Sequence, residues 1–141
     1  GVVSNMSAKG GVLGMTRQIA ADLLEIRAVN YVFENLEITG KSSRCFFHGA
    51  NDIILRDVSI HDCPYHGLLS ADDGSGSLLM ERCELYNNGE GDRHHQIYAT
   101  TDQDTHPGSV FRLVHSYIHD GRGGNNVKSR AQRNADASGR T

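Results

Sequence analysis

Polar and cationic residues recur at every second position in two segments of the C-terminal half of the chain. They are Gln96, Tyr98 and Thr100 in one segment, and Asn126, Lys128 and Arg130 in the other. Alternate side chains of an extended segment share one face, so each set predicts a row on a surface. Arginine and lysine pair with carboxylates, and a tyrosine ring can support a sugar ring. The pattern favours a site for an anionic sugar chain, and the alternative is a solvated face with ordinary surface charges.

Aspartates in two polar loops offer a second kind of chemistry. Asp73 lies in one loop, and Asp102 and Asp104 lie in the other. Carboxylate oxygens brought together from such loops could hold Ca²⁺, which prefers oxygen ligands. The alternative is that these aspartates only shape the turns.

Two of the eight histidines bear on the same surface. His66 and His95 occupy equivalent positions of the repeat described below, at the mouth of the predicted site. No thiol or carboxylate joins them to complete a tetrahedral ligand set, so we do not predict a zinc site. We assign His66 to ligand binding, and we expect His48 to be a hydrogen-bonded histidine of the core.

A repeat of 22 residues must position these side chains. The inward positions of the first clear unit are Leu24, Ile26, Tyr31, Phe33, Leu36 and Ile38, and those 22 residues later are Phe46, His48, Ile53, Leu55, Val58 and Ile60. Units of about 20–25 residues that contribute three short strands each are typical of a parallel β-helix. The sequence therefore predicts an all-β fold: a right-handed parallel β-helix of four to five rungs, with three short strands per rung and corners such as Arg56-Asp57.

The length of the repeat grows along the chain. Seven residues separate the first and second strands in the first unit (Leu24 to Tyr31), and fourteen separate them in the fourth (Ile97 to Phe111). In repeat proteins such insertions map to loops on one face, often the binding face. We therefore expect the first strand of each unit to form the floor of a groove.

The organisation along the chain has three parts. We expect residues 1–22 to form a cap or a poorly matching rung, 23–133 to form the rungs, and 134–141 to form a tail or the start of a further rung. Met15 and Ile19 stand at helical spacing, so an amphipathic helix over 14–22 is an alternative for the first part.

The composition excludes some functions. Fourteen basic and 17 acidic residues give a formal charge of −3, which leaves no overall basic field to hold nucleic acid. No apolar run approaches the ~18 residues that a membrane span requires. Cys45, Cys63 and Cys83 lack CxxC spacing, which favours buried thiols over a disulfide framework or structural zinc. The chain opens with neither methionine nor a signal peptide, so we expect it to be a segment of a longer protein.

Three segments carry a family resemblance: His95-Gln-Ile-Tyr98, His115-Ser-Tyr-Ile-His-Asp120 and Val127-Lys-Ser-Arg130. With the repeat over roughly 23–133, they resemble the right-handed parallel β-helix family with the pectate-lyase-like fold, and within it an uncharacterised bacterial subgroup. The family includes lyases and hydrolases acting on pectate, alginate and related acidic polysaccharides, and also non-enzymatic modules. The resemblance implies an acidic polysaccharide as ligand and an extracellular or periplasmic location.

If the resemblance extends to chemistry, it implies β-elimination of a uronate, which needs a base and a cation that stabilises the enolate-like charge. Lys128 would be the base, with a pKa lowered by Arg130 and by partial burial. Arg130 would neutralise the carboxylate, and Tyr98 or His95 would protonate the leaving oxygen. In alginate-lyase-like members the Lys and Arg come from neighbouring rungs, whereas here they share one strand. The alternative is a non-catalytic glycan-binding or structural module.

Overall fold

The computed structural model describes residues 12–13, 17–20, 24–26, 30–41 and 43–137, with side chains described over 30–41 and 43–135. These ranges contain strands and no helix, and hence no helix that could cross a membrane. The strands are β1 (Val12–Leu13), β2 (Arg17–Ala20), β3 (Leu24–Ile26), β4 (Val32–Thr39), β5 (Phe46–His48), β6 (Ile53–His61), β7 (Leu68–Ser70), β8 (Leu78–Glu81), β9 (Glu84–Tyr86), β10 (Ile97–Ala99), β11 (Phe111–Val114), β12 (Tyr117–His119), β13 (Val127–Ser129) and β14 (Asn134–Ala137). The alternative of a helix over 14–22 is wrong at Arg17–Ala20, which is the strand β2.

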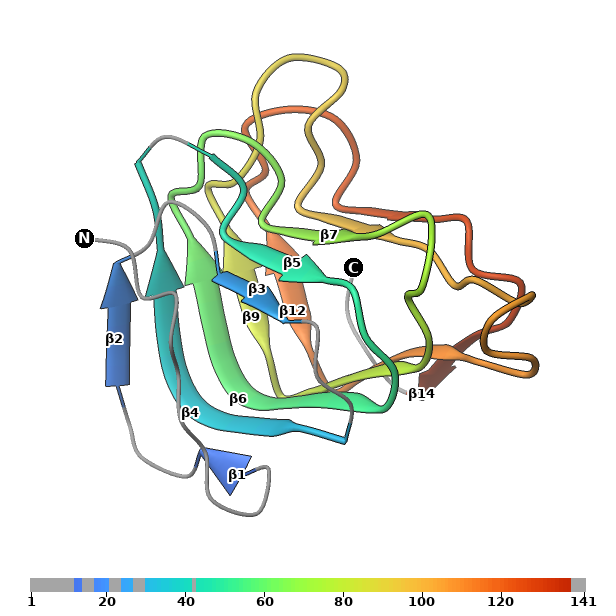
Figure 1. Ribbon diagram of the computed structural model, residues 1–141. Helices are drawn as coiled ribbons and strands as arrows, with labels where there is room; N and C mark the ends of the chain where they lie inside the picture. The colour runs from blue at the N-terminus through green and yellow to red at the C-terminus, as the bar shows by residue number, and fades with distance from the viewer. Residues whose placement is uncertain (1–11, 14–16, 21–23, 27–29, 42, 138–141) are drawn as a thin grey trace.

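The strands form two parallel sheets that face each other across the core. The larger sheet has nine strands, with the main path β1-β4-β6-β8-β11-β14, and it curls like half of a barrel (Figure 1). The smaller sheet has five short strands in the order β13-β10-β7-β5-β3. The chain alternates between the two sheets, so that strands from successive repeats lie side by side in each.

This arrangement contradicts the predicted right-handed β-helix with three short strands per rung. The corners at Asn35 and Asp57 do not end a strand, because β4 and β6 run through them as single strands of eight and nine residues. The ladder between β4 and β6 continues on both sides of the corner, with Glu34 beside Arg56 and Leu36 beside Val58. The predicted second and third strands therefore belong to one curled sheet, and each repeat contributes to two sheets.

The corner itself is a residue in the left-handed region of backbone conformation. Asn35, Asp57, Arg82 and His115 have φ between 47° and 54°, and they follow one another at matching positions of successive repeats. Asparagine and aspartate tolerate this conformation better than other residues with a side chain. One such residue turns the chain without a loop, so the sheet bends while its hydrogen-bonded ladder is kept.

The register and the inward face agree with the repeat. Phe46 pairs with Leu68, Leu68 with Ile97, and Ile97 with Val127 along the smaller sheet. The fully buried large side chains come from both sheets and are Phe33, Phe46, Ile38, Ile53, Leu55, Ile60, Leu68, Leu78, Met80 and Leu85. His48 is buried as expected, with Nε2 3.2 Å from the Gly76 carbonyl oxygen, and burial lowers the pKa of His48 to about 4. The side chains of Leu24 and Ile26 lie outside the described residues.

The prediction of three free thiols is wrong for two of the cysteines. Cys45 and Cys63 form a disulfide with Cα atoms 5.8 Å apart, and Cys83 is free and buried. Cys45 precedes β5 and Cys63 follows β6, so the bond closes a single repeat across the two sheets. The 18-residue separation gave no signal because the pairing depends on the width of the fold and not on local spacing.

Two histidines of the curled sheet are each held between two carboxylates. His61 lies 2.7 Å from Glu37 and 2.6 Å from Asp62, one carboxylate at each ring nitrogen. His119 lies 2.8 Å from Glu84 and 2.7 Å from Asp120 in the same way. Only an imidazolium can donate to two carboxylates at once. The arrangement therefore stabilises the protonated form of both rings.

We expect the disulfide to contribute about 3 kcal/mol to the free energy of unfolding, because it closes an 18-residue separation in the unfolded chain. Urea unfolding of wild type and of the Cys45→Ala/Cys63→Ala variant measures this contribution. Reductant should lower the wild-type midpoint and leave that of the variant unchanged. Thiol titration of the denatured, unreduced chain should find one thiol, and three thiols would contradict the pairing.

The stability that His61 and His119 contribute should fall as the pH rises above the ordinary histidine pKa of 6.5. Burial opposes protonation of His61, but hydrogen bonds to Asp62 and Glu37 outweigh it and raise its pKa; the hydrogen bond to Asp120 raises the pKa of His119. A raised folded pKa gives stability that is complete below 6.5 and is lost as pH rises through the folded value.

Urea unfolding from about pH 6 to about pH 9 tests this expectation. The free-energy difference between wild type and the His61→Gln/His119→Gln variant should therefore be largest near the acid end of this range and should shrink as the pH rises. His48, His66 and His95 have lowered pKa values and act in the opposite direction, because they take up protons near 6.5 only in the unfolded chain, but they do so equally in both proteins. A difference that does not change with pH would contradict the imidazolium assignment.

Candidate functional site

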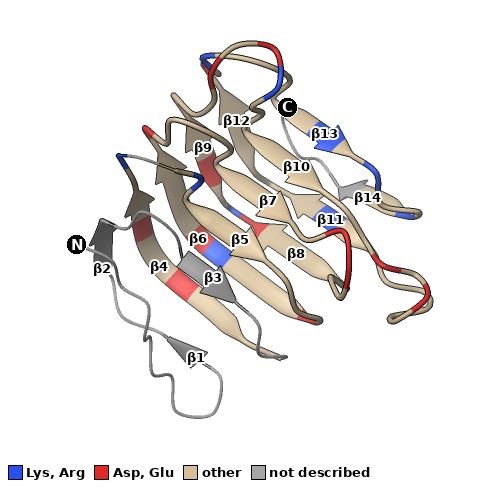
Figure 2. Ribbon diagram, turned by 45° about the horizontal axis from the view of Figure 1, so that its top comes forward, with Lys and Arg blue, Asp and Glu red and all other residues tan. Residues whose placement is uncertain are grey.

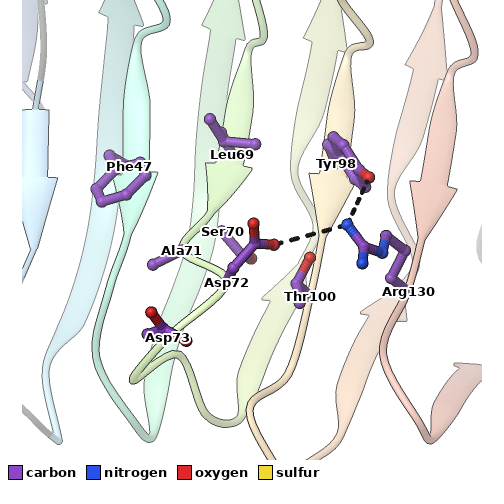
Figure 3. Close-up of a pocket in the computed structure, with 9 residues that line it drawn as sticks. All are labelled: Phe47, Leu69, Ser70, Ala71, Asp72, Asp73, Tyr98, Thr100 and Arg130. Atoms are coloured by element: carbon purple, nitrogen blue, oxygen red, sulfur yellow. Dashed lines mark hydrogen bonds and ion pairs between the residues drawn. The ribbon is translucent and has the colours of Figure 1, made fainter.

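The outer face of the five-stranded sheet carries a row of side chains that crosses the strands. Four of these strands, β5, β7, β10 and β13, have described side chains, and in each the middle of three residues points outward. The register places Phe47 beside Leu69, Leu69 beside Tyr98, and Tyr98 beside Lys128. Figure 3 shows the first three of these side chains in a line over successive ribbons. Together they form an apolar row that ends at a cation.

An open pocket of about 450 Å³ lies over this row. It is lined by Phe47, Leu69, Ser70, Ala71, Asp72, Asp73, Tyr98, Thr100 and Arg130. The first strands of the repeats therefore form the floor of a pocket, as the lengthened repeats predict. Figure 2 shows that β5, β7 and β10 carry no Lys, Arg, Asp or Glu and that β13 is basic. The loops that follow β7 and β10 are acidic.

Three of the predicted site residues meet at the C-terminal side of the pocket. Lys128 Nζ lies 4.8 Å from the centroid of the Tyr98 ring, and Arg130 Nη1 donates a hydrogen bond of 3.3 Å to the Tyr98 hydroxyl. Arg130 also lies 3.7 Å from Asp72. Lys128 is exposed, so the predicted partial burial of its ammonium group is wrong.

His66 and His95 lie beside this group, and their ring centroids are 5.7 and 5.4 Å from that of Tyr98. The His95 N–H donates to His66 Nδ1, and the Asn125 N–H donates to His95 Nδ1, both at 2.9 Å. A ring nitrogen that accepts from a backbone N–H carries no proton, so both rings are neutral with the proton on Nε2.

Their surroundings favour the same neutral form. Burial lowers the pKa of His66 to about 4, aided by the neighbouring His95 and His94. Burial and the charge of Lys128 also lower the pKa of His95. At neutral pH both rings are uncharged and keep an N–H on Nε2.

Gln96 and Asn126 do not lie on the pocket floor, so their predicted outward orientation is wrong. Gln96 is fully buried, where its Oε1 accepts from Asn88 at 2.9 Å and its Nε2 donates to the carbonyl of His119. Asn126 donates to the carbonyl of Ile118 at 3.3 Å. Both residues precede a strand, where the chain still turns and the alternation of faces does not yet apply. Thr100, by contrast, lines the pocket as predicted.

The three aspartates of the calcium hypothesis have separate roles. One oxygen of Asp102 accepts from the Gly74 N–H at 2.8 Å, and the other accepts from the N–H groups of Asp104 and Thr105 at 3.1 Å each. Asp102 thus joins two loops as a turn former, and Asp73 lines the pocket. Among the described residues, no group of three or more His, Cys, Asp or Glu is placed to hold a metal ion.

Phe47 and Leu69 line the pocket without having been predicted as site residues, and so does Asp72, which had been considered only beside Asp73 in the loop of the calcium hypothesis. Phe47 and Leu69 share a repeat position with Tyr98, and that shared position was the available signal. Asp72 had no comparable signal, because its ion pair with Arg130 joins two loops from different repeats.

Comparisons of the chain with protein-family models, with curated proteins and with solved structures gave no match. The function of the pocket is therefore inferred from its chemistry. It has an apolar floor, the half-buried Tyr98 and the exposed Arg130, with the exposed Lys128 and the neutral rings of His66 and His95 beside it.

The Asp102→Ala variant should unfold at a lower temperature than wild type, because it leaves three backbone N–H groups without their acceptor. Hydrogen bonds from Thr105 and from the Gly74 N–H lower the pKa of Asp102 to about 2, so the carboxylate is charged at neutral pH. Asp104→Ala is the matched control, since Asp104 is exposed and contributes only its N–H to this turn.

Thermal unfolding and amide exchange over 101–110 measure both variants. Faster exchange in Asp102→Ala alone supports the turn-forming role, whereas equal effects of the two substitutions would contradict it.

Proposed function

We propose that the pocket on the five-stranded sheet binds an acidic polysaccharide. The observation that carries the proposal is the placement of Lys128 over the Tyr98 ring and of Arg130 at its hydroxyl, at the end of an apolar row. A uronate ring offers apolar C–H faces to an aromatic ring and a carboxylate to a neighbouring cation. Arginine suits this role because its planar fork can donate two hydrogen bonds to one carboxylate.

Exposed charges bind a single carboxylate only weakly, since water and salt screen them. A polysaccharide compensates because its repeated carboxylates keep the local concentration of ligand high after the first carboxylate has bound. The neutral and partly exposed His66 adds an N–H donor that suits a sugar hydroxyl group without a cost of burying charge, whereas His95 is buried behind it. The ion pair between Asp72 and Arg130 is exposed, so a ligand carboxylate can compete with Asp72.

A second candidate is cleavage by β-elimination, and the geometry around Tyr98 favours it over hydrolysis. Lys128 and Arg130 both contact Tyr98, so a base, a cation and a hydroxyl lie together. In this scheme Lys128 takes the proton, Arg130 stabilises the charge, and Tyr98 or His95 protonates the leaving oxygen. His95 carries a proton on Nε2 for that step. Lys128 is exposed, so the partial burial that the elimination scheme assumes is missing, and binding is the leading proposal.

Replacing both cations tests the binding proposal. The Lys128→Ala/Arg130→Ala variant should bind pectate or alginate oligomers about tenfold or more weakly, because hydrogen bonds from charged groups to a carboxylate contribute substantially to affinity. Isothermal titration calorimetry measures the affinity, and added salt should weaken wild-type binding. Arg112→Ala is the matched control, because Arg112 is an exposed cation on β11 of the other sheet.

Unchanged affinity in the double variant would contradict the proposal. Near-ultraviolet absorbance of the same mixtures reports unsaturated products. Products that form with wild type and not with Lys128→Ala would establish elimination with Lys128 as the base, whereas binding without products would identify a non-catalytic module.

A further inference from the structure

We propose that Arg44 is a second anion-binding point of the pocket, at the opposite end of the apolar row from Lys128. The ligand would then be a chain with at least two negative charges that lies across β5, β7, β10 and β13. This inference rests on the proposed function, since it assumes that the row binds an acidic polysaccharide.

The two ends of the row have the same construction. At one end, the guanidinium carbon of Arg44 lies 4.7 Å from the centroid of the Phe47 ring. At the other end, Lys128 Nζ lies 4.8 Å from the centroid of the Tyr98 ring. Leu69 lies between the two rings in the register of the sheet. Each cation rests on an aromatic face, which leaves its outward N–H groups available to a ligand.

Arg44 also has an unused hydrogen-bond donor. Its Nε atom is buried and has no hydrogen-bond partner among the described residues. Among the same residues Arg44 forms no ion pair, whereas Arg56, Arg82 and Arg130 each do. A buried donor without an acceptor is costly, so such a group calls for an explanation. A carboxylate of the ligand can pair with the Nη groups of this guanidinium, and an outward rotation of the side chain on binding would bring Nε into the same contact.

The side chains between the two ends do not oppose a negative chain. His66 lies on the same flank as Arg44 and is neutral, and its low pKa of about 4 comes mainly from burial, then from His95 and His94, with a smaller effect of Arg44. His95 continues this flank toward Lys128, whose charge helps to lower its pKa. The acidic residues of the pocket, Asp72 and Asp73, follow β7 on the other flank.

The spacing sets a minimum length for the ligand. Arg44 precedes β5 and Lys128 lies on β13, three strand spacings away, which corresponds to about 14 Å. A single uronate cannot reach both cations, but a short oligomer can. Affinity should therefore rise steeply once the oligomer is long enough to join the two points.

Calorimetric titration with uronate dimers and hexamers tests the inference on the intact chain. The wild type should bind the hexamer about tenfold or more tightly than the dimer. Arg44→Ala should remove most of that difference and leave the affinity for the dimer unchanged, whereas Lys128→Ala should weaken both. Arg44→Gln provides a variant of similar shape, and Arg112→Ala controls for the loss of one positive charge. Thermal unfolding confirms that each variant is folded.

The outcomes separate the two proposals. If Lys128→Ala weakens binding while Arg44→Ala and Arg44→Gln bind the hexamer as wild type does, the second binding point is wrong and the proposed function stands. If the wild type binds neither oligomer, both are wrong. If only the Arg44 variants lose the higher affinity for the hexamer than for the dimer, Arg44 is established as a part of the site.

Discussion

The structure depends on a parallel ladder that keeps nearly the same register from one repeat to the next. Because like positions lie beside like positions, one inward residue defines an apolar column and one outward residue defines a surface row. The row of Phe47, Leu69 and Tyr98 exists only for this reason, since these residues are separated in sequence by 22 and 29 positions. The pocket is therefore a consequence of the pairing, and insertions change its walls without changing its floor.

The corners protect that register. A loop of variable length at each corner would let the two sheets shift relative to one another, whereas a single residue with positive φ turns the chain in a fixed way. Asn35 and Asp57 do so inside continuous strands, and Arg82 and His115 do so between two strands of the same sheet. The last two are costly choices for that conformation, so the packing of the repeats outweighs local preference there. The disulfide adds a covalent limit on the distance between the sheets in one repeat.

The sequence predicted the pairing well and the architecture poorly. Alternation and a constant repeat are properties of the backbone ladder, so the inward residues and the outward position of Tyr98, Lys128 and Arg130 could be read from spacing. Whether a corner ends a strand depends on the backbone angle of one residue, which alternation does not reveal. Alternation also failed at Gln96, which it predicted to face outward. The chain still turns at this residue, and the side chain points into the core. The pairing of Cys45 with Cys63 depends on the width of the fold, which no local pattern encodes.

The two sheets differ in how their charges are satisfied, and this difference supports the choice of the five-stranded sheet as the proposed binding face. On the curled sheet Arg56 lies between Glu34 and Glu81, at 3.3 and 2.9 Å, and His61 and His119 each lie between two carboxylates. These cations are neutralised within the protein, so an external anion would have to displace an existing partner. On the five-stranded sheet, Lys128 lies over an aromatic ring and pairs with no carboxylate among the described residues. Lys128 therefore keeps its charge available at the edge of the pocket, and the acidic ligand proposed above would supply its partner.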